Sequence, residues 1–208
     1  MLTHFTNQHI AGLEKRTRTA LVNSLSGFKS LNLIGTVNTS GQTNLAIFNS
    51  VMHIGADPAL MGFISRPDSV DRHTLENIKE TGFYTINHVH TEIFEKAHQT
   101  SARYGREESE FDAAGLKVDY KDGFPAPFVQ ESRIRIGLSL KEIVPVRVNN
   151  TLLIVGEITD LYFPGEIWDA GQGIFDFEKA GTVAGSSLEG YHTTQLIKRL
   201  KYAKPWSG

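Results

Sequence analysis

The segment from residue 43 to residue 87 constrains the fold more than any other part of the chain. It contains two apolar runs, residues 45–54 and residues 59–65, with the composition of β-strands. The sequence Ala56-Asp57-Pro58 between them is typical of a turn. The two runs are therefore predicted to form an antiparallel strand pair.

A short helix is predicted between this pair and a third strand. It follows a polar loop at residues 66–71, places Leu75 and Ile78 on one face and ends at Gly82, a residue type common at helix ends. Residues 83–89 then return as a strand.

Two polar residues, Asn49 and Ser50, interrupt the otherwise apolar first strand. An unpaired polar group in a protein interior costs roughly 1–3 kcal/mol of stability. Both side chains are therefore expected to find a partner or a ligand.

The predicted helix begins with Asp71-Arg72-His73-Thr74, and Arg66 lies just ahead of it. Either Asp71 or Thr74 is expected near the N-cap. Free backbone N–H groups, the positive end of the helix dipole, a hydroxyl and nearby cations are the components of a phosphate site. When these residues are taken alone, helix capping and surface solvation are the preferred interpretation.

The clearest alternation of apolar and polar residues, at residues 134–140, predicts a strand with one buried face. Asn149-Asn150 predicts a turn into a partner strand at residues 152–162, and residues 31–37 predict a strand ahead of the central segment. Sequential antiparallel strands of this kind favour a barrel closed by helices.

The rest of the chain is predicted to be helical or irregular, within a single domain at residues 1–208 that has no repeat or linker. Short helices are expected at residues 10–24 (with Gly27 as a break), 91–100 and 111–116, a basic helix at 193–201, and an irregular loop at 163–178.

Composition excludes several classes of function. Lysine and arginine number 21 against 23 acidic residues, a formal charge of −2, so no basic field favours nucleic acid or an acidic membrane surface. The absence of cysteine excludes disulfides, thiolate catalysis and thiolate metal sites. The first residues lack the pattern of a secretory signal and no apolar run is long enough to span a membrane, so a cytoplasmic location is expected.

No catalytic dyad or metal site is predicted. The serines lie outside any Gly-x-Ser-x-Gly sequence, which argues against a hydrolase. His88 and His90 lie two residues apart on one strand, a spacing open to metal binding, but no third ligand is indicated and packing histidines are the preferred interpretation.

Taken in order, the motifs of this chain resemble those of the flavin reductase-like family of FMN-binding split barrels. The resemblance covers most of the chain and rests on FNSVM at residues 48–52, DPALMGFISRP at 57–67, HTLENIKETGFYTIN at 73–87, TSARY at 100–104, SEFDAAGL at 109–116 and EGYHTTQLIKRLKYAKP at 189–205.

The resemblance implies a fold that is mainly β with helices, an antiparallel FMN-binding split β-barrel, and it implies a set of flavin contacts. These are Ile47, Phe48, Asn49 and Ser50 along the flavin ring, Ser65, Arg66, His73 and Thr74 around the phosphate, and Ser101 and Ala102 in the loop that follows.

Tyr191 and His192 are expected on the substrate side of this site. The family often has a Lys-Asp-Thr sequence at the helix start, where this chain has Arg72-His73-Thr74, so the phosphate-binding cation differs. Alternative interpretations stay open: Ile47 and Phe48 as core residues, Ser101 and Ala102 as an ordinary surface connection, and His192 as a buried histidine.

The resemblance further implies a homodimer that binds FMN non-covalently, with some contacts supplied by the partner chain, and that passes hydride from NADH or NADPH to flavin. The cofactor carries such chemistry, so no side-chain base is required. A flavoredoxin-like electron carrier with a protein redox partner is the alternative, and a barrel that binds another small ligand is a third possibility.

Overall fold

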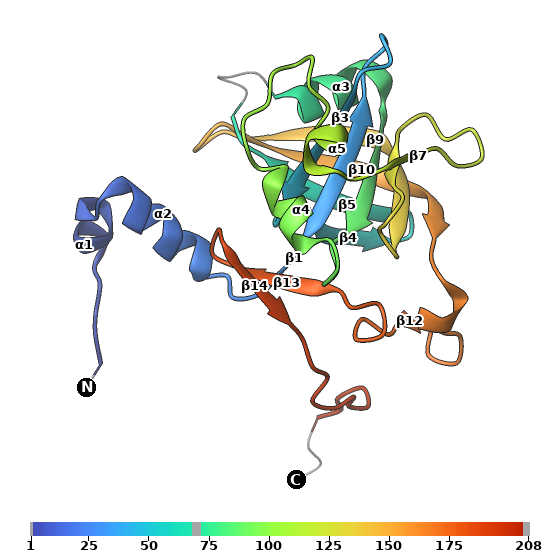
Figure 1. Ribbon diagram of the computed structural model, residues 1–208. Coiled ribbons are helices and arrows are strands. Elements are labelled where there is room, and N and C mark those ends of the chain that lie inside the picture. The colour runs from blue at the N-terminus through green and yellow to red at the C-terminus, as the bar shows by residue number, and fades with distance from the viewer. Residues whose placement is uncertain (1, 68–71, 206–208) are drawn as a thin grey trace.

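The main structural unit is a seven-stranded antiparallel sheet with the strand order β3-β2-β6-β9-β10-β5-β4 (Figure 1). The computed structural model describes residues 2–67 and 72–205. The strands of this sheet are β2 (Asn32–Val37), β3 (Thr43–Phe48), β4 (Met52–Ala56), β5 (Ala59–Ser65), β6 (Phe83–His88), β9 (Arg135–Val146) and β10 (Thr151–Tyr162). The strands β3 and β4 are its two edges and do not pair with each other, so the sheet is antiparallel but not closed.

The prediction of one strand over residues 45–54 is wrong, because the chain leaves the sheet between β3 and β4. β3 pairs with β2, whereas β4 pairs with β5 from Met52↔Gly62 to Ala56↔Ala59. In the gap, the Ser50 hydroxyl accepts a hydrogen bond from the Ile64 amide at 3.1 Å and donates one to the Ile64 carbonyl at 3.2 Å. A side chain thus takes the place of a main-chain partner on β5, and only the part of the predicted pair after the gap is confirmed.

The predicted pairing of residues 134–140 with 152–162 is confirmed as the β9–β10 ladder. Its register runs from Thr151↔Val146 to Tyr162↔Arg135, with shifts after Val155 and Ile158. β9 continues beyond the alternating segment to Val146, so the two strands form a ribbon of 12 residues each.

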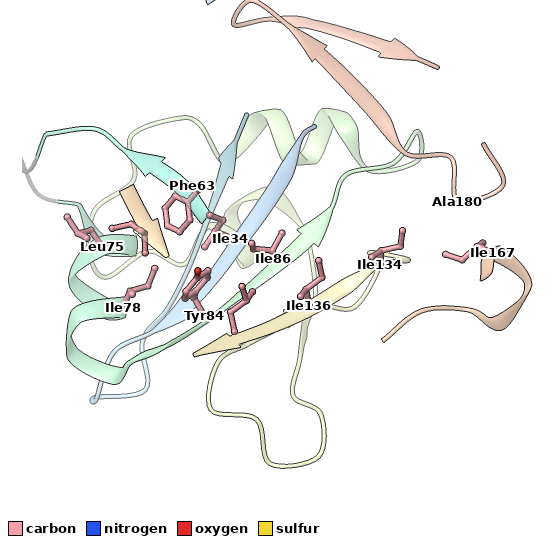
Figure 2. Packing of buried hydrophobic residues seen from close by; sticks show 12 residues of the cluster. Ile34, Phe63, Leu75, Ile78, Tyr84, Ile86, Ile134, Ile136, Ile167 and Ala180 are labelled. Atoms are coloured by element: carbon pink, nitrogen blue, oxygen red, sulfur yellow. The ribbon is translucent and has the colours of Figure 1, made fainter. Parts of the chain in front are cut away.

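The largest core cluster lies between this sheet and α3 (His73–Thr81) (Figure 2). Leu75 and Ile78 of the helix enter one end of it, as predicted, and Ile167 and Ala180 lie at the other end. α3 ends at Gly82, whose φ of 77° is the left-handed conformation that glycine adopts without a steric cost.

Tyr84 stands in the middle of this cluster and requires a glycine opposite it. A Cβ on Gly156 would lie 2.3 Å from the Tyr84 hydroxyl oxygen. The glycine in β10 therefore leaves room for the tyrosine ring and hydroxyl in the barrel interior.

A second core cluster lies under α4 (Phe94–Gln99) and α5 (Glu110–Ala114), on the other side of β2 and β3. The expected helices at residues 91–100 and 111–116 are confirmed in these shorter forms. The short strands β7 (Val118–Asp119) and β8 (Phe128–Val129) connect this layer to β9.

Both ends of the chain extend away from the barrel (Figure 1). α1 (Asn7–Gly12) and α2 (Lys15–Ser24) confirm the expected helices near residues 10–24, and neither buries a residue. A small sheet joins the two ends of the chain. In it, β1 (Lys29–Ser30), which follows α2, pairs with β13 (Val183–Ser186), and β13 pairs with β14 (Gly190–Thr193).

The predicted helix at residues 193–201 is wrong: no regular secondary structure follows β14 in the described residues, which reach 205. Leu196, Ile197 and Leu200 of this tail are 55%, 100% and 81% exposed. A helix of this length is marginal without a surface on which to bury its apolar face, and the tail packs on none here.

The irregular loop expected at residues 163–178 is confirmed, with small ordered pieces inside it. These are the 3-10 turn η1 (Gly165–Ile167) and the strand pair β11 (Trp168–Asp169) and β12 (Ile174–Phe175). Among the described residues no helix has the length and apolar character needed to cross a membrane.

Candidate functional site

The break between β3 and β4 brings the predicted ring-binding residues to one edge of the sheet. The Phe48 ring packs edge-on against Phe63, with centroids 4.9 Å apart, while Ile47 packs against the cluster under α4. The two side chains therefore serve the core on opposite faces, as successive strand residues do. Because β3 is an edge strand, alternate residues along it direct their backbone N–H and C=O groups to the unpaired side.

Asn49 and Ser50 both have partners, which resolves the cost expected from their sequence position. Ser50 bonds Ile64 as described, and the Asn49 amide nitrogen donates to the Ser187 carbonyl at 3.3 Å, in the turn between β13 and β14. The Asn49 amide oxygen has no hydrogen-bond partner among the described residues, so it is left to accept one.

The N-cap residue of α3 provides no side-chain cap, although the Glu76 carboxylate accepts a hydrogen bond from the Arg72 amide at 3.0 Å. Arg72 occupies the N-cap position and makes no capping hydrogen bond, and its guanidinium Nε instead donates to the Pro67 carbonyl at 3.3 Å. Asp71, one of the two expected caps, lies outside the described residues, and Thr74 is inside the helix. The first amides of a helix have no carbonyl partner within it, so this end is able to bind an anion.

Thr74 is buried in a polar network that the sequence interpretation missed. Its hydroxyl oxygen accepts from the Asn44 amide at 2.9 Å, and Thr36 accepts from Asn44 at 3.4 Å and from Asn77 at 3.1 Å. The Asn77 amide oxygen is buried without a partner among the described residues. A visible signal was Asn44, which interrupts an apolar strand as Asn49 does.

His73 lies beside a cavity of about 10 Å³, next to Arg106, whose guanidinium pairs with Glu76. A cavity of this size holds about one water molecule, so it is not a ligand pocket. The sequence interpretation also missed Arg106.

A buried carboxylate, that of Glu110 in α5, lies against β3. It accepts a hydrogen bond from the Leu45 amide at 2.9 Å, and burial raises the pKa of Glu110.

The remaining flavin contacts implied by the resemblance lie at the end of β5, in the loop after it and in the turn after α4. The Ser65 side chain is buried and its hydroxyl donates to the Arg66 carbonyl at 3.3 Å, while Arg66 itself is exposed. Ser101 and Ala102 form the exposed turn after α4, where their amides donate to the carbonyls of His98 and Gln99.

Tyr191 and His192 point in different directions from β14. The Tyr191 hydroxyl is 2.9 Å from His98 Nδ1 and its ring lines an open cavity of about 280 Å³, together with Phe94, Glu95, His98 and Glu189. His192 Nε2 instead lies 2.7 Å from the Ser186 hydroxyl, and its ring contacts Phe28. Only Tyr191 of this pair therefore lines the cavity.

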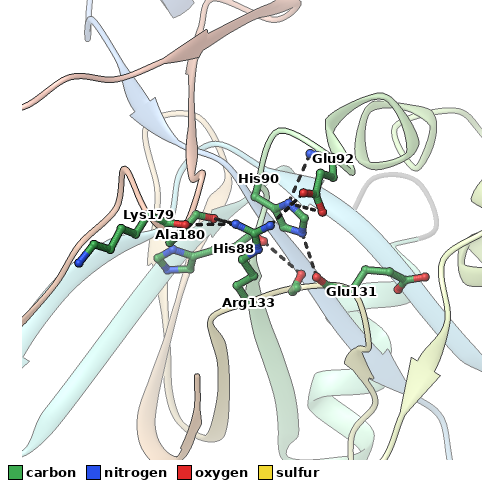
Figure 3. A network of polar contacts seen from close by, with 8 residues as sticks. His88, His90, Glu92, Glu131, Arg133, Lys179 and Ala180 are labelled. Atoms are coloured by element: carbon green, nitrogen blue, oxygen red, sulfur yellow. Dashed lines mark hydrogen bonds and ion pairs between the residues drawn. The ribbon is translucent and has the colours of Figure 1, made fainter. Parts of the chain in front are cut away.

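His90 and Arg133 belong to a polar network near the end of β6, in which the Arg133 guanidinium donates to the Lys179 and Ala180 carbonyls (Figure 3). The His88 ring stacks on Phe177, and its buried Nδ1 has no hydrogen-bond partner among the described residues. His90 Nε2 is 2.9 Å from the Glu131 carbonyl, and its Nδ1 accepts from the Glu92 amide. Burial lowers the pKa of His88 to about 4. These contacts are those of packing histidines, and the described residues contain no group of three side chains suited to a metal.

Residues 25–174, most of the chain, match the flavin reductase like domain. The chain belongs to the flavin reductase-like family. Membership confirms the resemblance drawn from the sequence motifs, and it makes this chain part of a family of oxidoreductases in which flavin takes part.

Solved structures agree with this family assignment. A protein from Shewanella frigidimarina, assigned as a flavin reductase with a split barrel domain, is 50% identical; the match covers 97% of this chain and 100% of that chain, with a TM-score of 0.93. Flavoredoxin of Desulfovibrio vulgaris (Miyazaki F) is 19% identical over 85% of this chain and 92% of its own, with a TM-score of 0.72. The second likeness is one of fold.

Curated relatives match over a shorter region. A protein of Aquifex aeolicus is 27% identical over 115 residues, which is 54% of this chain and 59% of the relative. The chain thus spans a little over half the length of this relative, and 55% of another from Halalkalibacterium halodurans.

Proposed function

We propose that this flavin reductase-like chain binds FMN non-covalently and uses NADH or NADPH to reduce flavin. One observation carries the proposal: the N-cap residue of α3 provides no side-chain cap, and the helix follows the loop that Arg66 begins. The Thr74 hydroxyl oxygen accepts from Asn44, which leaves its hydrogen free to be donated. These donors fit the phosphate of FMN, with Arg66 and His73 as the nearby cationic groups.

The flavin ring would lie along the unpaired side of β3. Ile47 and Phe48 would contact it through the backbone, since their side chains pack in the core. Asn49 would accept from a ring N–H through its free amide oxygen. Ser50 would also contact the ring through its backbone, because its hydroxyl already bonds Ile64.

When bound, FMN would supply the redox chemistry, which is hydride transfer from nicotinamide to flavin. The residues of this chain bind and orient the two reactants. Ser101 and Ala102 would cover the ring from the turn after α4, and Tyr191 would border the nicotinamide.

A visible absorbance spectrum tests the proposal directly. Purified protein is recorded before and after addition of FMN, and then with NADH or NADPH under anaerobic conditions. We expect a perturbed flavin spectrum that bleaches rapidly with at least one nicotinamide. A protein that leaves the FMN spectrum unchanged would refute the flavin assignment and favour a barrel for another ligand.

The likeness of fold to a flavoredoxin supports an electron carrier as the second candidate. Such a carrier would hold FMN but exchange electrons with a redox protein. Bound flavin that resists both nicotinamides and is reduced quickly by a small redox protein would favour the carrier over the reductase.

The exposed chain ends support a homodimer. α1 and α2 bury no residue, and Leu25, Phe28 and Ile197 are 71%, 66% and 100% exposed. A second copy would cover this apolar surface and complete the flavin site.

Light scattering tests the homodimer and is expected to give twice the mass of one chain. The double variant Ile197→Asp, Leu200→Asp is expected to shift the protein toward the monomer. A wild-type monomer at high concentration would contradict the dimer.

A further inference from the structure

The open cavity between α4 and β14 has aromatic walls. The Phe94 and Tyr191 rings lie 5.3 Å apart at 50°, and the His98 ring lies 5.7 Å from Tyr191 at 78°. The hydrogen bond between the Tyr191 hydroxyl and His98 Nδ1 fixes the orientation of these two rings. The cavity therefore presents aromatic surface whose geometry is set before any ligand enters.

The charged residues that line this cavity are acidic. Among the described residues, Glu95 and Glu189 line it and no lysine or arginine does. Glu95 has no ion-pair partner in the part of the chain that the structure describes. Glu189 lies 3.7 Å from Arg16, but both side chains are more than two-thirds exposed, so this pair contributes little and a ligand could replace it.

We propose that this cavity binds a planar aromatic cation, such as a pyridinium ring. Cations are attracted to the faces of aromatic rings, and carboxylates at the rim add a second attraction for the same charge. The volume of about 280 Å³ lies just below the range of pockets that hold drug-sized molecules, so it suits a single ring system. A carboxylate-bearing ring of the same size would be repelled by Glu95 and Glu189.

The cavity adjoins the strand proposed for flavin without sharing its contacts. Phe94, Tyr191 and Ile47 pack against one buried cluster, and Asn49 bonds Ser187 in the hairpin that also carries Glu189. The inference rests in part on the proposed function, which places Tyr191 beside the nicotinamide, and it goes beyond that function because the cavity would bind the cation with or without FMN. The cation could be the head of an oxidised nicotinamide or an unrelated aromatic cation.

Three ring compounds of similar size and different charge test the proposal: 1-methylnicotinamide is a cation, nicotinamide is neutral and nicotinate is an anion. Each is titrated into the full chain, with and without FMN, and binding is followed by NMR shifts of the ligand and of the tyrosine rings. We expect 1-methylnicotinamide to bind about tenfold more tightly than nicotinate, with nicotinamide between them.

The double variant Glu95→Gln, Glu189→Gln should remove most of the preference for the cation while nicotinamide binds as before. A matched control, Glu142→Gln with Glu166→Gln, removes two exposed carboxylates that do not line the cavity and should keep the preference. Equal binding of nicotinate and 1-methylnicotinamide, or a preference that survives the first variant, would overturn the proposal.

Competition identifies the source of the cation. If NAD⁺ displaces 1-methylnicotinamide, the site serves a nicotinamide; if it does not, the site serves a separate aromatic cation. Both results retain the cavity as a cation site. Because the titration is run without FMN as well, a failure of flavin binding would refute the proposed function and leave this result standing.

Discussion

At the scale of single residues, Tyr84 carries a hydroxyl into a core that gives it no hydrogen bond. The ring is fully buried, the hydroxyl has no partner among the described residues, and burial raises the pKa of Tyr84 well above its usual range. An unpartnered buried hydroxyl opposes folding by about 1–3 kcal/mol. The tyrosine is thus tolerated by the core rather than required by it.

We expect Tyr84→Phe to raise the free energy of unfolding by about 1 kcal/mol, because the ring stays and the unpaired hydroxyl is removed. Urea denaturation followed by circular dichroism measures the change. The exposed Tyr202→Phe is the control and should have no effect. A destabilised Tyr84→Phe would mean that the hydroxyl has a partner, such as a buried water.

Arg66 offers a second test at this scale. If it contacts the phosphate, Arg66→Ala should weaken FMN binding about tenfold, the loss expected for one charge-assisted hydrogen bond, and leave riboflavin binding unchanged. Fluorescence titration with both flavins measures the effect. Arg147→Ala removes an exposed arginine in the β9–β10 turn and should bind FMN normally. An equal loss for riboflavin would place the arginine away from the phosphate.

At the scale of elements, Ser50 lies in the gap between β3 and β4, at residues 49–51, and attaches it to β5. Its hydroxyl makes two hydrogen bonds to the Ile64 backbone, where β4 has not yet begun. Ser50→Ala would leave both backbone groups of Ile64 without these partners. The edge of β5 therefore depends on a side chain at this point.

Ser50→Ala should lower the free energy of unfolding by about 1–3 kcal/mol and speed hydrogen exchange of the Ile64 amide. Both are measured on the same protein by denaturation and by NMR. Ser26→Ala, at an exposed serine, is the matched control. Unchanged protection of Ile64 would show that another group replaces the serine hydroxyl.

Sequence patterns predicted the elements whose periodicity agrees with their packing. The alternation at residues 134–140 and the Leu75–Ile78 face of α3 both reflect burial on one side, and both are confirmed. The helix expected after Thr193 failed because helical spacing stabilises a helix only where a surface receives its apolar face. The strand at residues 45–54 failed because Ser50 replaces a backbone partner, which local composition does not reveal.

The candidate site could be predicted only in part for a related reason. Asn49 was visible as a polar residue after an apolar run and Thr74 as a residue at the start of a helix, and their neighbours in the fold were not visible. Asn44 and Thr74 are 30 residues apart, and Asn49 and Ser187 are 138 apart. Contacts over such separations follow from strand order, which a single sequence does not encode locally.

At the scale of the whole molecule, buried histidines couple stability to pH. The folded-state pKa of His88 is about 4, below its usual value of 6.5, because burial disfavours the charged ring; burial lowers the pKa of His90 as well. The unfolded chain therefore binds more protons than the folded one between these values. The stability contributed by the neutral rings is complete above pH 6.5 and is lost as the pH falls toward 4.

We expect the free energy of unfolding to fall by about 2 kcal/mol for His88 across this window, less than the full difference in pKa would give, because the residue as a whole is only half-buried. His88→Gln should flatten the pH profile, whatever its stability at pH 7.5. Denaturation at several pH values measures both slopes, and His53→Gln, an exposed histidine, should retain the wild-type slope. Parallel profiles for wild type and His88→Gln would remove His88 as the cause.

The open side of the sheet has a mechanical consequence. No backbone pairing joins β3 to β4 within the described chain, so widening the gap between these edges breaks none of the ladder bonds that hold the seven strands together. If a flat ring enters here as proposed, bending of the strands and the hydrogen bonds of Asn49 and Ser50 would accommodate it. The barrel is therefore expected to deform most easily between β3 and β4, because every other pair of neighbouring strands in the sheet is hydrogen-bonded.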